Sequence, residues 1–187
     1  MPQSKRYALV GCGGRGAMFI DAVYKRYAQH AELVALCDLS PTRTAYWNSV
    51  IQDKHGGDAL PAYTDQQFDQ MISETRPDVV IVCTVDATHH TYIIRAMELG
   101  CDAITEKPMT IDAPRCRTVL DAVERTGRKL TVTFNYRYAP LHAQMKKTLM
   151  EGAIGQIKAI HFEWLLNTQH GADYFRRWHR DKRNSGG

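Results

Sequence analysis

The sequence predicts an α/β fold, a doubly wound parallel sheet with helices on both faces. Three observations over the first 135 of 187 residues support this prediction. Strand-like and helix-like stretches alternate, the strand-like runs are apolar without polar alternation, and a glycine-rich turn joins the first strand to the first helix. Continuously apolar strands are typical of parallel sheets that helices cover on both faces.

The elements follow one another in the order expected of such a sheet. Apolar runs predict five strands: Tyr7–Val10, Leu33–Cys37, Val79–Thr84, Ala103–Thr105 and Leu130–Phe134. The stretches between them predict five helices: Ala17–Ala28, Thr42–Gln52, Asp65–Thr75, Thr91–Leu99 and Ala113–Arg125. Asp112 precedes the last of these helices and is suited to cap it, and Gly100 follows the fourth as a helix-ending glycine.

The pattern changes after residue 135. We expect a helix over Ala139–Glu151, whereas Ile157–Leu166 alternates as a long strand with Ile160, Phe162 and Trp164 on one apolar face. That face needs a covering layer. We therefore expect a second domain of α+β type, with an antiparallel sheet, that begins at residue 136 and is incomplete at residue 187.

Composition argues against several classes of protein. No apolar run approaches the roughly 18–20 residues that span a bilayer, and the amino terminus lacks the apolar stretch of a signal peptide. The net charge is +4, but residues 176–183 hold five basic side chains and one acidic one, so the remainder is neutral and nucleic-acid binding is not expected. Five widely spaced cysteines without a CxxC pair indicate reduced thiols, no metal site and a cytoplasmic protein.

A glycine pattern follows the first predicted strand. In a GxGxxG turn, the first glycine allows a tight turn, the second lets the backbone approach a pyrophosphate, and the third lets the helix pack on the strand. An acidic residue, Asp38, ends the second strand 22 positions after the last glycine, where it can reach ribose hydroxyls. The pattern predicts a dinucleotide site of the Rossmann type formed by Gly11, Cys12, Gly13, Gly14, Arg15, Gly16 and Asp38.

The same aspartate bears on the choice of cofactor. A carboxylate accepts hydrogen bonds from a ribose diol and repels a 2′-phosphate, so Asp38 favours NAD, with NADP less favoured. Arg43 follows five residues later and could soften that repulsion.

Residues 83–110, CTVDATHHTYIIRAMELGCDAITEKPMT, resemble a known family. Its members carry a threonine after a strand, a short turn, a histidine, a helix and then Glu-Lys-Pro, which here correspond to Thr84, His89 and Glu106-Lys107-Pro108. FNYRYAP at 134–140 and RWHRDKRNSGG at 177–187 also resemble family segments. The chain is similar to the N-terminal half of a Gfo/Idh/MocA protein, the glucose–fructose oxidoreductase and inositol dehydrogenase group. Val85 departs from the proline of many members, which predicts a slightly different turn.

The resemblance implies an NAD(P)-binding Rossmann domain over residues 1–135 and the beginning of a substrate and oligomerisation domain over 136–187. It implies an oxidoreductase that transfers a hydride between a nicotinamide and the CH–OH group of a sugar, cyclitol or related polyol, and that forms homo-oligomers through its C-terminal sheet. Lys107 would be catalytic, on a cis Lys107–Pro108 peptide bond, and Glu106 would orient it or contact the cofactor. Further residues implied at the cofactor are Thr84, Val85, His89 and Asn135, and at the substrate Arg137, Trp178 and His179.

Two other functions fit the same residues. One is an NAD-dependent glycoside hydrolase on this fold, which oxidises its sugar only transiently, and the other is a non-catalytic nucleotide sensor. Lys107 directly after Glu106 argues against the sensor. The substrate itself is not specified by these residues, and in the family the second acid/base group lies in a segment beyond the position of Gly187.

Overall fold

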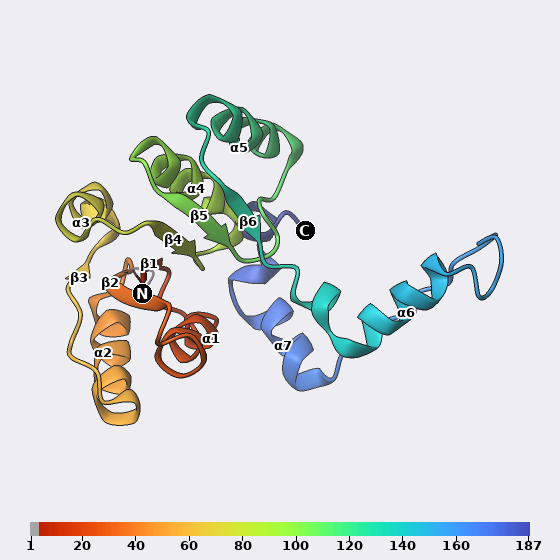
Figure 1. The fold of residues 1–187 in the computed structure, drawn as a ribbon, viewed down its shortest axis with the longest axis horizontal. Coiled ribbons are helices and arrows are strands. Elements are labelled where there is room, and N and C mark those ends of the chain that lie inside the picture. The colour runs from red at the N-terminus through yellow and green to blue at the C-terminus, as the bar shows by residue number, and fades with distance from the viewer. Residues whose placement is uncertain (1–3) are drawn as a thin grey trace.

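A six-stranded parallel sheet forms the centre of the protein, seen in a computed structural model that describes residues 4–187 (Figure 1). The strands lie in the order β3-β2-β1-β4-β5-β6, with β1 and β4 at the middle of the sheet, and every neighbouring pair is parallel. The strands are β1 (Lys5–Val10), β2 (Ala31–Cys37), β3 (Ala62–Tyr63), β4 (Val79–Val82), β5 (Asp102–Thr105) and β6 (Leu130–Val132). This is the strand order of a doubly wound Rossmann sheet, the fold class that the sequence predicted.

Helices cover both faces of the sheet. They are α1 (Gly16–Asp21), which continues into a π-helical turn over Ala22–Arg26, α2 (Pro41–His55), α3 (Phe68–Thr75), α4 (His89–Glu98) and α5 (Ala113–Thr126). The helices pack on the sheet through two buried clusters of side chains, one on each face. Leu9 and Ile81 pack with residues of α1 and α2, whereas their neighbours Val10 and Val82 pack with residues of α3, α4 and α5. Side chains of one strand alternate between the faces, so the buried part of β1, residues 8–10, and the whole of β4 are apolar at every position.

Up to residue 135, the predicted elements agree with the observed ones except in detail. Predicted strand Val79–Thr84 ends at Val82, predicted strand Leu130–Phe134 ends at Val132, and β3 was not predicted because its two residues give no apolar run. The predicted helix over Asp65–Thr75 begins as a 3-10 turn, with Thr64 and Gln67 forming a reciprocal capping box.

The chain after the sheet forms an arm. It starts with the 3-10 turn η4 (Asn135–Tyr138) and α6 (Pro140–Met150), which extends away from the sheet in Figure 1. The predicted strand Ile157–Leu166 is wrong: these residues form neither strand nor helix, and the side chains of Ile160 and Phe162 are 83% and 77% exposed. A strand needs a partner for its backbone groups, and among the described residues no strand lies beyond Val132. The expected antiparallel sheet is therefore also absent from them.

The chain then returns to the sheet. Helix α7 (Thr168–Arg176), the 3-10 turn η5 (Trp178–Arg180) and helix α8 (Lys182–Ser185) were not predicted. Helix α8 contacts the 3-10 turn η3 (Asp86–Thr88), which follows β4. Gly186, at a positive φ of 82°, lies so close to Ile111 that a Cβ would come within 2.8 Å of its carbonyl oxygen. These contacts place η5 beside the carboxyl ends of the strands.

Candidate functional site

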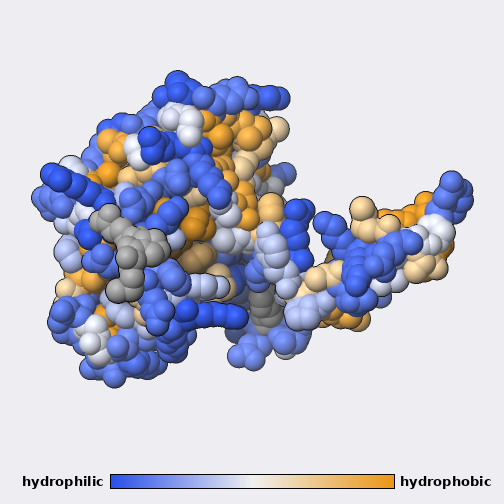
Figure 2. Space-filling view, viewed as in Figure 1, coloured by the Kyte–Doolittle hydropathy of each residue, from blue (hydrophilic) through white to orange (hydrophobic). Residues whose placement is uncertain are grey.

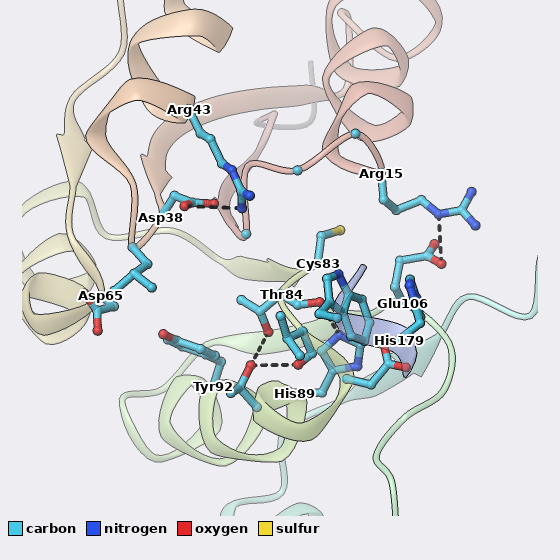
Figure 3. A pocket seen from close by; sticks show the side chains of 18 of the residues that line it. Arg15, Asp38, Arg43, Asp65, Cys83, Thr84, His89, Tyr92, Glu106 and His179 are labelled. Atoms are coloured by element: carbon cyan, nitrogen blue, oxygen red, sulfur yellow. Dashed lines mark hydrogen bonds and ion pairs between the residues drawn. The ribbon is translucent and has the colours of Figure 1, made fainter. Parts of the chain in front are cut away.

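A cavity of about 510 Å³ lies at the carboxyl ends of the central strands (Figure 3). This edge of an open α/β sheet, at the point where the strand order reverses between β1 and β4, is where such folds bind ligands. Most of the lining comes from the glycine loop after β1, the end of β2, the turn after β4, the loop after β5 and residues 177–179, and Arg43, Asp65 and Tyr92 line the cavity from other elements. The lining residues are Gly11, Gly13, Gly14, Arg15, Asp38, Leu39, Arg43, Asp65, Cys83, Thr84, Val85, Asp86, Thr88, His89, Tyr92, Glu106, Lys107, Arg177, Trp178 and His179.

The three glycines of the turn differ in their surroundings. Gly11 has a φ of 90°, and a Cβ there would lie 2.5 Å from the Cys83 carbonyl oxygen, because the turn after β4 passes directly over it. Gly16 lies against Leu9, where a Cβ would come within 3.1 Å of a side-chain carbon. Gly13 has no neighbour within 4 Å of the corresponding position. Gly11 and Gly16 are thus needed for packing, whereas the Gly13 backbone is open to a ligand.

The Asp38 carboxylate is buried and tied to the glycine loop. Its Oδ2 accepts a hydrogen bond from the Cys12 backbone N–H (2.7 Å), and its Oδ1 accepts one from the Ser40 N–H (2.8 Å). The Arg43 guanidinium lies 3.8 Å from Oδ1 and is more than half exposed. Each carboxylate oxygen still has a lone pair available, so Asp38 can accept hydrogen bonds from two further hydroxyls.

Glu106 joins the glycine loop to the end of the sheet. It is buried, its Oε2 lies 3.2 Å from Arg15 Nε, and its Oε1 accepts a hydrogen bond from the Thr133 hydroxyl (2.7 Å). Figure 3 shows the Arg15 and Glu106 side chains meeting beside the cavity. Both carboxylate oxygens are therefore engaged by groups other than Lys107, so Glu106 fixes the loop from which Lys107 projects.

His89 ties the same loop to the turn after β4. Its ring is 1% exposed, with Nδ1 2.8 Å from the Pro108 carbonyl oxygen and Nε2 3.1 Å from the Thr84 carbonyl oxygen. Burial lowers the pKa of the imidazole, which opposes the effect of these two acceptors. The contacts hold the Lys107–Pro108 peptide bond, which is cis as the resemblance implied.

Lys107 is exposed on the cavity wall, close to a carboxyl group that sequence reasoning missed. That group is Asp86, which is 9% exposed. Burial raises its pKa to about 6, against the opposing attraction of Lys107. No periodic signal marks Asp86, because it stands in a turn; only its position two residues after Thr84 could have indicated it.

Trp178 and His179, which the resemblance implied at the substrate, lie in this cavity with Lys107 although some 70 residues separate them in the chain. Asn135 and Arg137 do not line it; both are exposed in η4. Cys12 and Gly16 belong to the glycine loop but are buried and do not line the cavity. Leu39, Asp65 and Tyr92 complete the wall near Asp38 and were not predicted, since a single polar or aromatic residue in a loop or helix has no pattern.

The remaining chemistry of the described residues is limited. Burial raises the pKa of the Cys12 and Cys83 thiols, so both stay protonated at neutral pH. Across residues 4–187, no three potential metal ligands come together. Within the same range, no helix combines the length and apolar character of a membrane span.

Comparison with known proteins agrees with this geometry. The Gfo/Idh/MocA family model, described as an oxidoreductase family with an NAD-binding Rossmann fold, matches residues 5–134. YteT of Bacillus subtilis, a protein classed by name among the oxidoreductases, is 35% identical over 184 residues, which cover 98% of this chain and 42% of YteT. The inositol 2-dehydrogenase/D-chiro-inositol 3-dehydrogenase of Lactiplantibacillus plantarum is 28% identical over 152 residues, 81% of this chain and 41% of that protein.

The fold recurs in solved structures. The WlbA dehydrogenase of Bordetella pertussis, in complex with NADH and UDP-GlcNAcA, superposes with a TM-score of 0.74 at 22% identity, covering 83% of this chain and 44% of that one. At this identity the likeness concerns the fold. The chain spans less than half the length of each of these three proteins.

Proposed function

This chain belongs to the Gfo/Idh/MocA family of oxidoreductases, and from that premise we propose that it forms the nucleotide-binding part of an NAD-dependent dehydrogenase. The proposed substrate is a sugar, a cyclitol or a related polyol, in keeping with the inositol dehydrogenase among its relatives. One observation carries the proposal: a single cavity joins the glycine loop and Asp38 to Lys107 and His179. In Figure 3, Asp38 lies at one side of that cavity and His179 at the other.

The residues present fit the cofactor. The open backbone at Gly13 leaves room for a pyrophosphate, and the Asp38 oxygens can accept hydrogen bonds from the adenosine ribose. We assign cofactor contacts to the predicted residues that line the cavity, which are Gly11, Gly13, Gly14, Arg15, Asp38, Thr84, Val85, His89, Glu106 and Lys107, and not to Cys12, Gly16 and Asn135, which do not line it. When bound, NAD supplies the hydride acceptor for oxidation of a CH–OH group.

Lys107 is the residue of this chain assigned to the chemistry. Oxidation of an alcohol places negative charge on the hydroxyl oxygen, and an ammonium group that donates a hydrogen bond to that oxygen stabilises the charge. Glu106 and His89 hold the loop on either side of Lys107, through Arg15 and the Pro108 carbonyl oxygen respectively. The loop is thereby fixed before substrate arrives.

Activity tests this assignment. We expect the full-length protein to reduce NAD with at least one of myo-inositol, scyllo-inositol and methyl glucoside, and Lys107→Met to lower kcat at least about 100-fold while the protein still binds NAD. The dehydrogenase accumulates one NADH per product. A glycoside hydrolase would release the aglycone without accumulating NADH, and a sensor would bind NAD without turnover.

We propose NAD over NADP because a 2′-phosphate at this ribose would face the buried Asp38 carboxylate, with Asp65 also in the wall. Arg43 pairs with Asp38 at a long distance, 3.8 Å, and is more than half exposed, so it offsets this repulsion only weakly. We expect Asp38→Asn to narrow the affinity ratio of NAD to NADP about tenfold, as measured by calorimetry, whereas the exposed control Asp53→Asn leaves it unchanged. Tighter binding of NADP to the wild-type protein would contradict the assignment.

The proposal includes a division of labour along the chain. Residues 1–135 bind the nucleotide, and residues 136–187 belong to a substrate and oligomerisation domain. Support comes from the sheet, whose last strand in the described residues ends at Val132, and from the apolar arm that follows.

A further inference from the structure

The segment Arg177–Gly187 brings one histidine to the side of the cavity that holds Lys107. This segment comprises η5 and α8, and it is anchored by the contact of α8 with η3 and by the packing of Gly186 on Ile111. The Ser185 hydroxyl donates a hydrogen bond to the His179 carbonyl oxygen (2.8 Å), which ties η5 to α8. These contacts of α8 therefore fix the backbone that carries His179.

The imidazole of His179 is held on three sides. Its Nδ1 lies 3.1 Å from Asp173 Oδ2, at ion-pair distance. Its ring stacks on Trp178, with centroids 3.6 Å apart and planes at 25°, and the Tyr174 ring lies 5.0 Å away. The side chain is about one-fifth exposed, so it is held in one orientation while still reaching the cavity.

This arrangement leaves one nitrogen for a ligand. Nδ1 is buried and faces a carboxylate, which favours the tautomer with the proton on Nδ1 and a free lone pair on Nε2. The charged groups that face the ring are Asp173 and Arg177 from the α7 side and Lys107 from the loop after β5, whereas the Ser185 hydroxyl of α8 bonds the His179 backbone. Burial lowers the pKa of His179, with Asp173 opposing this effect and Lys107 and Arg177 adding to it, so the imidazole is neutral at neutral pH.

We propose that His179, oriented by Asp173 and backed by Trp178, binds substrate by accepting a hydrogen bond from a substrate hydroxyl at Nε2. This inference rests on the proposed function, since it places the hydroxyl in the cavity that holds Lys107. Lys107 is a cationic donor and His179 a neutral acceptor, and a polyol with neighbouring hydroxyl groups can satisfy both at once. The pair therefore selects substrates with at least two hydroxyls over simple alcohols.

The test uses His179→Phe, which keeps the ring on Trp178 and removes the acceptor. In the full-length protein, assayed with the three polyols named above, we expect kcat/KM to fall roughly tenfold, mainly through KM, with NADH affinity by fluorescence unchanged. The matched control is His30→Phe, because His30 is exposed at the opposite edge of the sheet, just before β2. It is expected to behave as wild type.

A second variant tests the orientation. Asp173 raises the pKa of His179, so Asp173→Asn should lower it and move the acidic limb of the kcat/KM profile to lower pH. A histidine that only supports the fold would leave that limb in place. The inference is overturned if His179→Phe matches His30→Phe, if the limb does not move, or if His179→Phe also loses NADH affinity. If the wild-type protein binds NAD but oxidises none of the polyols, the proposed function fails and the inference fails with it.

Discussion

Gly11 and Gly13 stand two positions apart in the glycine loop but should respond differently to the same substitution. In Gly11→Ala, the new Cβ would overlap the Cys83 backbone at a φ that L-residues avoid, so we expect a loss of about 2–5 kcal/mol in the free energy of unfolding. In Gly13→Ala, the Cβ meets no protein atom, so the fold should keep its stability while NAD affinity falls. Thermal unfolding and calorimetry with NAD distinguish the two effects.

Each of the two glycine variants serves as the control for the other. If Gly11→Ala unfolds at the wild-type temperature, the turn after β4 does not pass over Gly11 as the structure has it. If Gly13→Ala binds NAD like the wild type, the open backbone at Gly13 does not face the cofactor.

Ionisation of Asp86 destabilises the folded protein, the opposite of the usual effect of a paired carboxylate in a native structure. Burial raises its pKa to about 6, so the folded protein holds this proton more tightly than the unfolded chain, whose aspartates titrate near 4. The ionised carboxylate therefore destabilises the fold above about pH 6, and stability is regained as the pH falls from 6 towards 4. We expect Asp86→Asn to stabilise the protein at pH 7 by about 2–3 kcal/mol and to have little effect at pH 4.

Chemical denaturation at both pH values measures this difference. The exposed Asp53→Asn variant provides the control, since it removes a carboxylate that has no buried surroundings. An equal effect of Asp86→Asn at pH 4 and pH 7 would show that the buried carboxyl group is not the cause.

At the residue scale, a site residue could be predicted from the sequence only where a local sequence pattern marked it. Asp38 and Lys107 could be found because each stands at a fixed distance from an apolar strand or within a short motif, and both line the cavity. Asp86 and Asp173 could not be found, because their roles depend on which segments the fold brings together. Asp173 pairs with His179, which lies six residues later and beyond the end of α7, and no sequence pattern links the two.

At the scale of elements, the caps of α5 show local sequence acting directly. The Asp112 side chain accepts a hydrogen bond from the Arg115 N–H (2.8 Å), and Gly127 ends the helix at a φ of 64°. We expect Asp112→Ala to cost about 1 kcal/mol in thermal unfolding, because it leaves an N–H at the helix start without its partner. Asp121→Ala, on the exposed side of the same helix, should cost much less; equal losses would argue against the cap.

Elements were predictable where burial on two faces imposed a pattern. The apolar runs of β1, β2 and β4 could be predicted as strands, because each residue in them packs on one helical layer or the other. Helix α7 was not predicted, because its nine residues include Gly171, which disfavours a helix, and only three apolar side chains, those of Ala172, Tyr174 and Phe175. Segment Ile157–Leu166 has the alternation of a strand, but alternation predicts a strand only when a neighbouring strand is present to pair with it.

At the scale of the whole molecule, the arm after the sheet carries the apolar side chains that its own fold leaves uncovered. Ile160, Phe162 and Trp164 are all exposed, with Phe162 and Trp164 stacked on each other, and Figure 2 shows hydrophobic residues along this projecting segment. Leu141 and Met145 of α6 are exposed as well. Burying each such side chain is worth roughly 1.5–3 kcal/mol, so the arm favours contact with another protein surface.

We therefore expect the 187-residue chain, made alone, to bind NAD and to self-associate through this arm. Replacing Ile160, Phe162 and Trp164 with serine should shift its sedimentation towards that of a monomer and leave NAD affinity unchanged, because the cavity lies at the sheet and not on the arm. Leu120→Ser, at an exposed apolar position of α5 outside the cavity, serves as the control for association, since it removes apolar surface elsewhere. A wild-type chain that sediments as a monomer at high concentration would contradict the prediction. Association that survives the triple substitution would place the contact on another surface. Self-association through the arm would support the proposed division of the chain, in which the sheet binds the nucleotide and the residues after it bind a partner subunit.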